Sequence, residues 1–298
     1  MAEHFVTRKN CELCGGDQKR ILLSLEFTDP LLWSFLAQYY EGRIDKSDVA
    51  GGKYEVVRCL QCGFIWQAQI LNDTLMEKLY SFWVVPERSL EKKRCADISL
   101  YSNYANEVKV IASLLGKKPF EINVLDFGMG WGYWCFMAKA FGYNVTAFEM
   151  SKERSEFARR NGINVLDKFS ETSLQQFDFI NAEQVFEHLS APSKILHRLS
   201  SSLRKGGVIR ISVPNGESIE KELANPNWKP SKNAVHPLEH VNCFTSATLI
   251  RLADGSGLKI MAQPRLNRSF KSYLRHFMGK YFNRYYGACL YFRKESGG

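Results

Sequence analysis

A glycine-rich stretch from Val124 to Trp134 constrains the fold of this chain more than any other segment. It begins with a short apolar run of strand-forming residues, and glycines then alternate at positions 128, 130 and 132. Glycine lets the backbone bend sharply and approach a ligand without an intervening Cβ. The stretch therefore predicts a buried strand, a tight turn and a helix start. Asp126 would place a carboxylate at the carboxyl end of that strand, where open α/β sheets bind ligands.

Two well-known phosphate-binding turns do not fit this spacing. In the dinucleotide-binding pattern G-x-G-x-x-G the third glycine would fall at position 133, which is Tyr133. A P-loop requires a Lys-Ser or Lys-Thr pair after its glycines, and no such pair follows here. A glycine-rich turn with a purely structural role stays open as the alternative.

A second β-rich run over residues 143–148 ends in Glu149, about twenty residues after the glycines. An acid at this distance hydrogen-bonds ribose hydroxyls in nucleotide-binding α/β folds. We predict that Glu149 binds a ribose and that Met150 lies beside an adenine. A solvated glutamate at the end of a strand is the alternative.

The rest of the C-terminal two thirds alternates between helix and strand patterns. Apolar residues at helical spacing predict a helix from Leu100 to Leu115, which ends at Gly116. Ser151 should cap a helix that runs through Arg160. Further strands are expected at residues 163–166, 177–183, 208–213, 258–262 and 288–292, and a helix with Pro192 in its first turn should end at Gly206-Gly207. This alternation predicts a parallel, doubly wound sheet.

The segment Asp126-x-Gly128-x-Gly130-x-Gly132 resembles motif I of the class I S-adenosylmethionine (SAM) methyltransferases. The resemblance implies a Rossmann-like α/β fold with a mostly parallel seven-stranded sheet, and SAM as the methyl donor. Residues 184–189, which end in Glu-His-Leu, are similar to the segment after the fourth strand in that superfamily. It follows from this likeness that Glu183 and Gln184 face the SAM pocket. Asp167, at the end of the third strand, is a candidate adenine ligand.

Two Cys-x-x-Cys-Gly units in the N-terminal part predict a structural zinc site. Paired units of this kind are strong zinc signals, and four thiolates complete a tetrahedron without an open position. The insert between them has apolar and aromatic residues at helical spacing, and we expect it to form a helix packed on a zinc ribbon. Redox dithiols are the alternative. The predicted ligands are Cys11, Cys14, Cys59 and Cys62.

Residues 233–244, after the fifth predicted strand, contain two histidines and a glutamate. Methyl transfer needs a group that removes the proton of the nucleophile, and histidine is the natural base near neutral pH. His240 with Glu239 is the first choice for this base, and His236 is the second. Neighbouring residues face apart in regular structure, so Glu239 need not pair with His240. A loop histidine with a structural role is the alternative here, and it is the first interpretation of His188 in the Glu-His-Leu segment.

The order of these motifs is similar to that of a bacterial methyltransferase family with an N-terminal zinc-binding domain, several members of which methylate sugars attached to nucleotides. The resemblance implies that His240 is the base, with Glu239 beside it, and that Tyr80 contacts the substrate. It also implies a small sugar- or glycan-related acceptor, phosphorylated or nucleotide-linked. The expected domains are a zinc-binding ribbon over residues 1–72, a helical linker over 73–120 and a SAM-binding domain over 121–298.

Composition adds broad limits on partners and location. The net charge of +9 is compatible with nucleic acid, an anionic surface or a phosphorylated substrate, and it does not choose among them. No apolar run is long enough to span a membrane, and no signal peptide is visible, so we expect a cytoplasmic enzyme. The charged stretch 86–94 is expected to be a surface linker. Oligomeric state is not predicted.

Residues 268–286 interleave aromatic and basic side chains. An amphipathic helix packed on the sheet is the first interpretation, and a phosphate-binding rim, a membrane contact or a nucleic-acid groove are the others. An RNA or protein methyltransferase that uses the zinc ribbon and this stretch for recognition is therefore the second functional hypothesis. Nucleic acid is the less expected partner, because the ribbon lacks a dense cluster of lysine and arginine.

Overall fold

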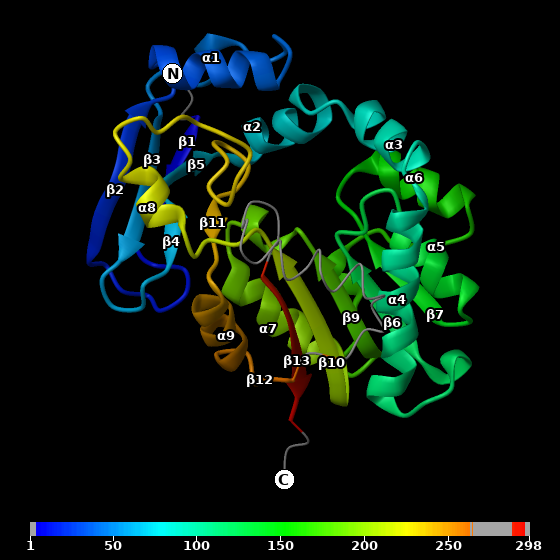
Figure 1. Cartoon of the computed structure of the whole chain (residues 1–298). Coiled ribbons are helices and arrows are strands. Elements are labelled where there is room, and N and C mark those ends of the chain that lie inside the picture. The colour runs from blue at the N-terminus through cyan, green and yellow to red at the C-terminus, as the bar shows by residue number, and fades with distance from the viewer. Residues whose placement is uncertain (1–3, 263, 265–287, 296–298) are drawn as a thin grey trace. The chain divides into compact units, whose positions relative to one another are not determined.

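The computed structural model describes residues 4–262, 264 and 288–295 (Figure 1). The chain divides into two compact units, each drawn from several segments of the sequence. The first unit contains Met1–Ser89, Phe186–Pro192 and Pro214–Arg251. The second contains the remaining segments, Leu90–Val185, Ser193–Val213 and Leu252–Gly298. Two segments from the second half of the sequence thus belong to the unit that carries the four paired cysteines.

The second unit contains a seven-stranded sheet in the order β12-β13-β10-β9-β6-β7-β8. The five strands from β8 to β10 in this order are parallel, whereas β13 is antiparallel to both β10 and β12. The predicted doubly wound, mostly parallel sheet is therefore confirmed. The strands are β6 Asn123–Phe127, β7 Asn144–Phe148, β8 Asn164–Leu166, β9 Phe177–Glu183, β10 Leu203–Val213, β12 Leu258–Ile260 and β13 Ala288–Lys294.

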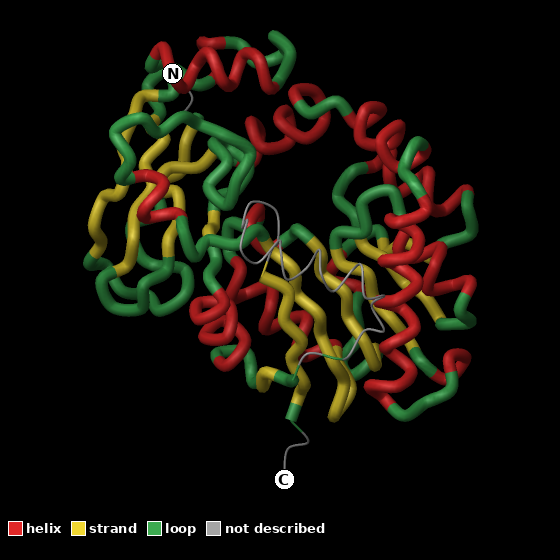
Figure 2. The backbone as a smooth tube through the Cα atoms, in the orientation of Figure 1, coloured by secondary structure: helices red, strands yellow, loops and turns green. Residues whose placement is uncertain are grey.

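Helices cover both faces of this sheet, as Figures 1 and 2 show. Helices α4 Ile98–Leu115, α5 Tyr133–Ala140 and α6 Lys152–Arg160 pack on one face, and α7 Pro192–Ser202 lies on the other. Strands of such a sheet are buried on both sides, as the first six residues of β9 are, including the polar Asp178 and Asn181. The core under the first three helices includes Val108, Ile111, Val124, Ala138, Ala147, Ala158 and Phe179.

The predicted helix boundaries in this unit follow from local capping. Helix α4 ends at Gly116, which has a left-handed φ of 62°. Helix α6 begins after Ser151, whose hydroxyl accepts a hydrogen bond from the backbone N–H of Arg154. Both ends agree with the sequence prediction, because each depends on residues close together in the chain.

The connection between α7 and β10 differs from the prediction. Helix α7 ends at Ser202, and β10 already begins at Leu203, before the glycines that were expected to stop the helix. The pairing of β10 with β9 shifts register between Leu203 and Val208, and Gly206 has a φ of 73°. The two glycines form an irregularity inside the strand, since glycine tolerates the left-handed backbone that such a bulge requires.

The expected surface linker over residues 86–94 contains the boundary between the two units, after Ser89, and its backbone forms helix α3 Pro86–Arg94. Proline is favourable at the first position of a helix, where its missing N–H has no intrahelical acceptor. Glu87 lies in the first turn, and Lys92, Lys93 and Arg94 lie in the last turn. This charge distribution favours the helix dipole at both ends.

The first unit contains an antiparallel sheet in the order β11-β4-β3-β2 and a two-stranded ribbon of β1 and β5. Its strands are β1 Phe5–Thr7, β2 Lys19–Glu26, β3 Lys53–Cys59, β4 Ile65–Gln67, β5 Gln69–Leu71 and β11 Asn242–Cys243. Its helices are α1 Pro30–Tyr39, α2 Asp73–Lys78 and α8 Ile219–Leu223, and α9 Ser246–Asp254 follows β11. Single helical turns span Lys46–Asp48, Leu79–Trp83, Pro119–Glu121, Phe169–Glu171 and Phe186–His188 along the chain.

Helix α1 confirms the prediction of a helix in the insert between the cysteine pairs. Asp29 caps it by accepting hydrogen bonds from two backbone N–H groups, and a proline opens its first turn. Leu32 and Leu36, one turn apart, are fully buried in a core that also contains Tyr54 and Trp83. Among the described helices, none has the length and hydropathy of a membrane span.

Candidate functional site

In the second unit, the turn between β6 and α5 has a backbone that requires glycine. Gly128, Gly130 and Gly132 have φ values of 77°, 56° and 75°, all in the left-handed region. A Cβ added to Gly128 would lie 2.4 Å from Cγ2 of Val185, whereas one added to Gly130 would meet no heavy atom within 4 Å. The turn is thus tightly packed at its first glycine and open at its second.

Glu149 at the end of β7 holds this turn. Its carboxylate accepts hydrogen bonds from the backbone N–H of Gly130 at 3.0 Å and of Ser151 at 2.9 Å. The backbone N–H groups of Gly128 and Met129 donate to the carbonyl oxygen of Phe148, at 2.8 and 3.2 Å. The two motifs that the sequence singled out are therefore joined directly, and each carboxylate oxygen of Glu149 keeps a further lone pair for a ligand hydroxyl.

Asp126 is only 2% exposed and lies below the turn. Its carboxylate accepts hydrogen bonds from Nδ2 of Asn181 at 2.8 Å and from the thiol of Cys135 at 3.2 Å. Burial raises the pKa of Asp126 to about 6, against the hydrogen bonds that favour its ionised form. Asp126 thus organises the ends of β6 and β9, and its contact with a cofactor stays a prediction.

The other predicted cofactor residues end neighbouring strands of the same sheet. Glu183 ends β9 and lies 3.5 Å from the guanidinium of Arg210. Gln184 is exposed, and its φ of 55° turns the chain at this point. Met150 is 85% exposed after β7, and Asp167 after β8 is paired with Arg159 at 2.5 Å.

A buried charge cluster that the sequence analysis did not predict lies beside Asp126. Arg210 on β10 donates to Oδ1 of Asn181 at 2.7 Å and to Glu107 of α4 at 2.9 Å. Burial raises the pKa of Glu107 to about 7, although Arg210 lowers it. Lys93 of α3 donates to the hydroxyl of Tyr104 at 2.6 Å. The one available sequence signal was an arginine inside the otherwise apolar strand 208–213.

In the first unit, the four paired cysteines converge. Their Sγ atoms all lie within 4.8 Å of one another, with 3.6 Å between Cys11 and Cys62 and between Cys14 and Cys59. A tetrahedron with Zn–S bonds of about 2.3 Å has S···S edges of about 3.8 Å. Burial alone would raise the pKa of Cys59, but hydrogen bonds from the backbone N–H groups of Cys62 and Gln61 outweigh it and lower the pKa to about 7. The donor set and its spacing fit a tetrahedral zinc ion.

The first unit also brings His188 and His240 together, with ring centroids 4.9 Å apart. Nδ1 of His240 lies 2.5 Å from the carbonyl oxygen of Asn233, and Nδ1 of His188 lies 2.9 Å from that of Glu239. A carbonyl oxygen only accepts, so Nδ1 carries a proton in both rings, and in a neutral His240 ring Nε2 keeps a lone pair. The hydroxyl of Tyr80 lies 3.1 Å from Nδ1 of His188. Burial, followed by the neighbouring histidines, lowers the pKa of His240 well below its ordinary value, so its ring is neutral at pH 7.

Glu239 faces away from His240. Its carboxylate accepts a hydrogen bond from the hydroxyl of Tyr40 at 3.0 Å and lies 4.0 Å from Nδ1 of His236. Burial raises the pKa of Glu239. His236 is fully buried against Tyr39 and Phe35, and burial lowers its pKa to about 3. Neither ring nitrogen of His236 has a hydrogen-bond partner within the described residues.

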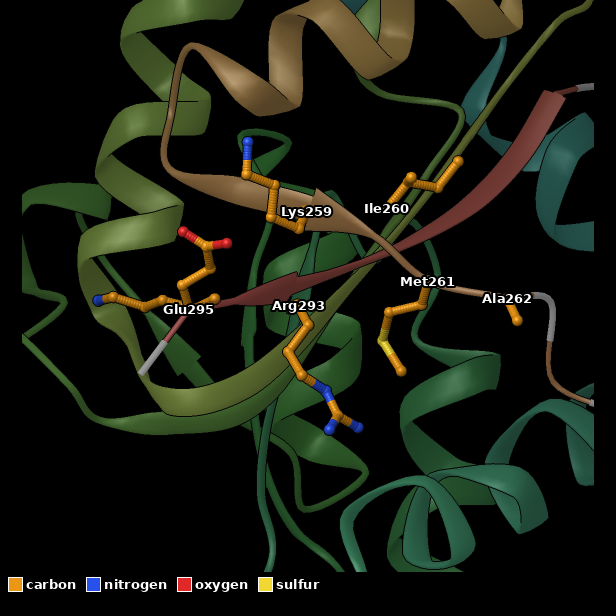
Figure 3. Close-up of a pocket in the computed structure, with 7 residues that line it drawn as sticks. Lys259, Ile260, Met261, Ala262, Arg293 and Glu295 are labelled. Atoms are coloured by element: carbon orange, nitrogen blue, oxygen red, sulfur yellow. The ribbon is translucent and has the colours of Figure 1, made fainter. Parts of the chain in front are cut away.

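Two hollows among the described residues of the second unit lie away from the predicted site. One of about 370 Å³ lies along β12 and β13 and is lined by Lys259, Met261, Arg293 and Glu295 (Figure 3). Another of about 450 Å³ includes Asn123 and Asn144, the first residues of β6 and β7. This second hollow therefore lies at the amino ends of the strands, opposite the glycine turn.

Comparison with known proteins gives the family. A family model described as a methyltransferase domain matches residues 100–263, which is more than half of the chain. The chain belongs to the methyltransferase-domain family. Its second unit has a Rossmann-like α/β fold, and the matched residues include the glycine turn and strands β6 to β10 of its mixed sheet.

Curated relatives and solved structures are distant from this methyltransferase. It is 23% identical over 155 residues to a ubiquinone biosynthesis O-methyltransferase of Aeromonas salmonicida, covering 47% of this chain and 64% of that protein. It is 27% identical over 115 residues to the same-named protein of Erwinia tasmaniensis, covering 35% and 45%. Both matches span less than two thirds of the relative. The 1,6-didemethyltoxoflavin-N1-methyltransferase of Burkholderia thailandensis aligns with a TM-score of 0.49 at 17% identity, covering 80% of this chain and 99% of that one.

The structure thus separates the predicted residues of this methyltransferase into two groups. The cofactor candidates belong to the second unit, and the cysteines and the base candidates belong to the first. His188, for which the sequence analysis preferred a structural role, contacts His240, and Tyr40, which it did not select, bonds to Glu239. The aromatic and basic stretch 268–286 lies outside the described residues.

Proposed function

We propose that this methyltransferase transfers the methyl group of SAM to a small sugar- or glycan-related acceptor, with His240 as the general base. The observation that carries the proposal is the ring of His240, whose Nδ1–H donates to the carbonyl oxygen of Asn233 and leaves Nε2 as an acceptor, with the ring of His188 4.9 Å away. A nucleotide-linked keto sugar is the first acceptor to test, because the order of the sequence motifs resembles that of enzymes acting on such compounds.

The second unit offers the groups that would hold the donor. Bound SAM supplies an electrophilic methyl group on a sulfonium. Glu149 keeps lone pairs for ribose hydroxyls, and the space at Gly130 leaves room for a ligand against the turn. Met150 and Asp167 would lie beside the adenine, and Glu183 and Gln184 would line the remaining part of the SAM pocket.

The first unit offers the proton acceptor. Nε2 of neutral His240 would take the proton of the acceptor, which leaves an imidazolium held by the carbonyl oxygen of Asn233. His188 and Tyr80 would orient the acceptor. Glu239 and His236 would support this site without touching the acceptor, since Glu239 lies 4.0 Å from His236 and accepts a hydrogen bond from Tyr40.

We also propose that Cys11, Cys14, Cys59 and Cys62 hold one structural zinc ion, as the sulfur spacing supports. The expected domain limits, residues 1–72, 73–120 and 121–298, belong to the same proposal. Four thiolates leave no open position on zinc, so the ion would stabilise the ribbon without taking part in methyl transfer.

A second candidate function is metal-assisted O-methylation of a hydroxylated ring. Ligand-type atoms of Glu187, His188 and His240 lie within 4.8 Å of one another. Imidazoles and a carboxylate suit a divalent ion that lowers the pKa of a bound hydroxyl. The relatives from Aeromonas and Erwinia carry names of O-methyltransferases, which agrees with this chemistry.

Release of S-adenosylhomocysteine from a panel of acceptors tests these functions. The panel contains a nucleoside diphosphate keto sugar, a catechol and a structured RNA. We expect turnover with the sugar, and His240→Asn should lower it by about 10²–10⁴. The control His197→Asn changes an exposed histidine of α7 and should keep the wild-type rate.

The outcomes of this assay separate the candidates. Turnover of the catechol that depends on added Mg²⁺ or Mn²⁺, and that Glu187→Gln removes, would replace the first proposal by metal-assisted O-methylation. Turnover of the RNA alone would favour the recognition hypothesis. A wild-type rate of His240→Asn with the sugar would remove His240 from the role of base.

A further inference from the structure

The segment 233–242, here called the histidine loop, is held by residues that flank the cysteine pairs. Gln67 donates from Nε2 to the carbonyl oxygens of both His236 and His240, each at 3.0 Å. Its backbone N–H donates to the carbonyl oxygen of Val241 at 3.0 Å. Gln67 ends β4, five residues after Cys62. The backbone at His236, His240 and Val241 is therefore fixed by a residue close to the second cysteine pair.

Arg8, which lies close to the first cysteine pair, also forms hydrogen bonds to the histidine loop. Its Nη1 donates to the carbonyl oxygen of Val241 at 2.9 Å, and its Nη2 donates to Oδ1 of Asn242 at 2.8 Å. Arg8 precedes Cys11 by three residues, is 6% exposed, and has its Nε 3.8 Å from the carboxylate of Glu12. A buried guanidinium that donates two hydrogen bonds to one neighbouring loop fixes the position and orientation of that loop.

Asn242 extends this hold to His188. Its Nδ2 donates to the carbonyl oxygens of Phe186 at 2.9 Å and of Leu189 at 2.6 Å. These two carbonyls bracket Glu187 and His188 in the chain. The side chain of Asn242 thus accepts a hydrogen bond from Arg8 through its oxygen. Through its nitrogen it donates to the turn that carries His188.

We infer that Arg8 and Gln67 are positioning residues that align His188 and His240, and that the four-cysteine cluster sets this alignment by joining the segments that carry them. The inference rests on the proposed function of His240 and on a zinc ion at the cysteines. The cluster joins the two pairs through Cys11–Cys62 and Cys14–Cys59, so it fixes Arg8 and Gln67 relative to each other. Zinc would then act on catalysis through protein hydrogen bonds, although it touches no reactant.

The test compares Arg8→Met, Arg8→Lys and Gln67→Met with a matched control, Lys19→Met. Nζ of Lys19 donates to the carbonyl oxygens of Arg8 and Lys9 beside the same cysteine pair, at 3.5 and 3.4 Å. It therefore perturbs the neighbourhood of the cluster without removing a bond to the histidine loop. Each full-length variant is assayed for zinc content, for affinity toward S-adenosylhomocysteine, and for kcat with the acceptor that the panel identifies.

We expect Arg8→Met and Gln67→Met to keep one zinc per chain and an unchanged Kd for S-adenosylhomocysteine, while kcat falls about 10- to 100-fold, as for outer hydrogen-bond partners of functional histidines. Arg8→Lys should recover part of kcat, because an ammonium reaches one of the two acceptors. Lys19→Met should match the wild type. Wild-type kcat in Arg8→Met, or an equal fall in Lys19→Met, would overturn the inference.

A nitrogen-15 spectrum of the histidine rings gives a readout that needs no acceptor. In the wild type, His240 should show a single tautomer with the proton on Nδ1. Arg8→Met should mix the tautomers of His240 and leave the signal of His197 unchanged. An unaltered His240 signal would overturn the positioning role. If His240→Asn keeps full turnover while Arg8→Met still mixes the tautomers, the proposed base fails and the positioning stands.

Discussion

Gly128→Ala should destabilise the second unit more than any other single methyl group added in the glycine turn. The new Cβ would lie 2.4 Å from Cγ2 of Val185, and the residue would have to keep a φ of 77°. A left-handed backbone costs a non-glycine residue about 1–2 kcal/mol. Overpacking against a held side chain costs about 1–3 kcal/mol. We therefore expect a loss of about 2–5 kcal/mol in the free energy of unfolding.

Two variants separate the contributions to this loss. Gly130→Ala has the same kind of backbone strain, with a φ of 56°, but its Cβ meets no heavy atom within 4 Å. It should cost only about 1–2 kcal/mol. In the double variant Gly128→Ala/Val185→Ala the steric part should disappear, which gives a favourable coupling of about 1–3 kcal/mol.

Urea denaturation followed by circular dichroism and tryptophan fluorescence measures these differences, and Trp131 and Trp134 report from the turn and from α5. Equal losses in Gly128→Ala and Gly130→Ala would refute the argument from close packing. So would an absence of coupling with Val185→Ala. Binding of S-adenosylhomocysteine should weaken in Gly128→Ala, because Glu149 holds the displaced turn through Gly130.

Three further predictions concern buried charges and the cysteines. Burial raises the pKa of Asp126 from 3.8 to about 6, so its protonated form stabilises the fold below pH 4. About 3 kcal/mol of the free energy of unfolding is then lost as the pH rises through 6. Urea titrations of Asp126→Asn should not show this decline, whereas those of the wild type should. Burial would raise the pKa of Asp178, but hydrogen bonds from Lys117, Asn123 and Arg204 outweigh it and lower the pKa. The ionised carboxylate therefore stabilises the fold near neutral pH, and this stabilisation is lost in acid. Asp178→Asn should therefore cost about 1.5–3 kcal/mol at pH 7, and this cost should shrink as the pH falls below 3.8; a cost that stays constant across the acid range would contradict the ion pairs. Cys14→Ser should remove zinc by metal analysis and lower the melting temperature, whereas Cys95→Ser, at an exposed cysteine outside the cluster, should change neither.

The parts of the fold that the sequence predicts are those fixed by residues close together in the chain. The glycine turn needs its three left-handed residues within five positions, and Ser151 caps α6 from the adjacent turn. The irregularity at Gly206 depends instead on how β10 pairs with β9, which no local pattern contains. No helix was assigned within the predicted linker 86–94, although the order of its charges favours one.

The candidate site was predictable in its residue types and not in its pairings. Acidic residues at the ends of strands indicated the edge of the sheet where a ligand would bind. Only the fold shows that Glu149 accepts a hydrogen bond from the backbone N–H of Gly130. Glu239 and His240 are neighbours in sequence, yet Glu239 contacts Tyr40, which lies 199 positions away. Arg8 reaches Val241 across 233 positions. Such pairings follow from tertiary packing, and periodicity and spacing do not encode them.

The central claim is that a SAM-type nucleoside binds against the turn after β6, and titration calorimetry with S-adenosylhomocysteine tests it most directly. The variant is Gly130→Arg, which extends a side chain into the open space at that glycine. The control is Gly206→Arg, which has a φ of 73° and equally open space in β10. We predict saturable binding to the wild type and to Gly206→Arg, and none to Gly130→Arg. Equal affinity in all three proteins would contradict the account.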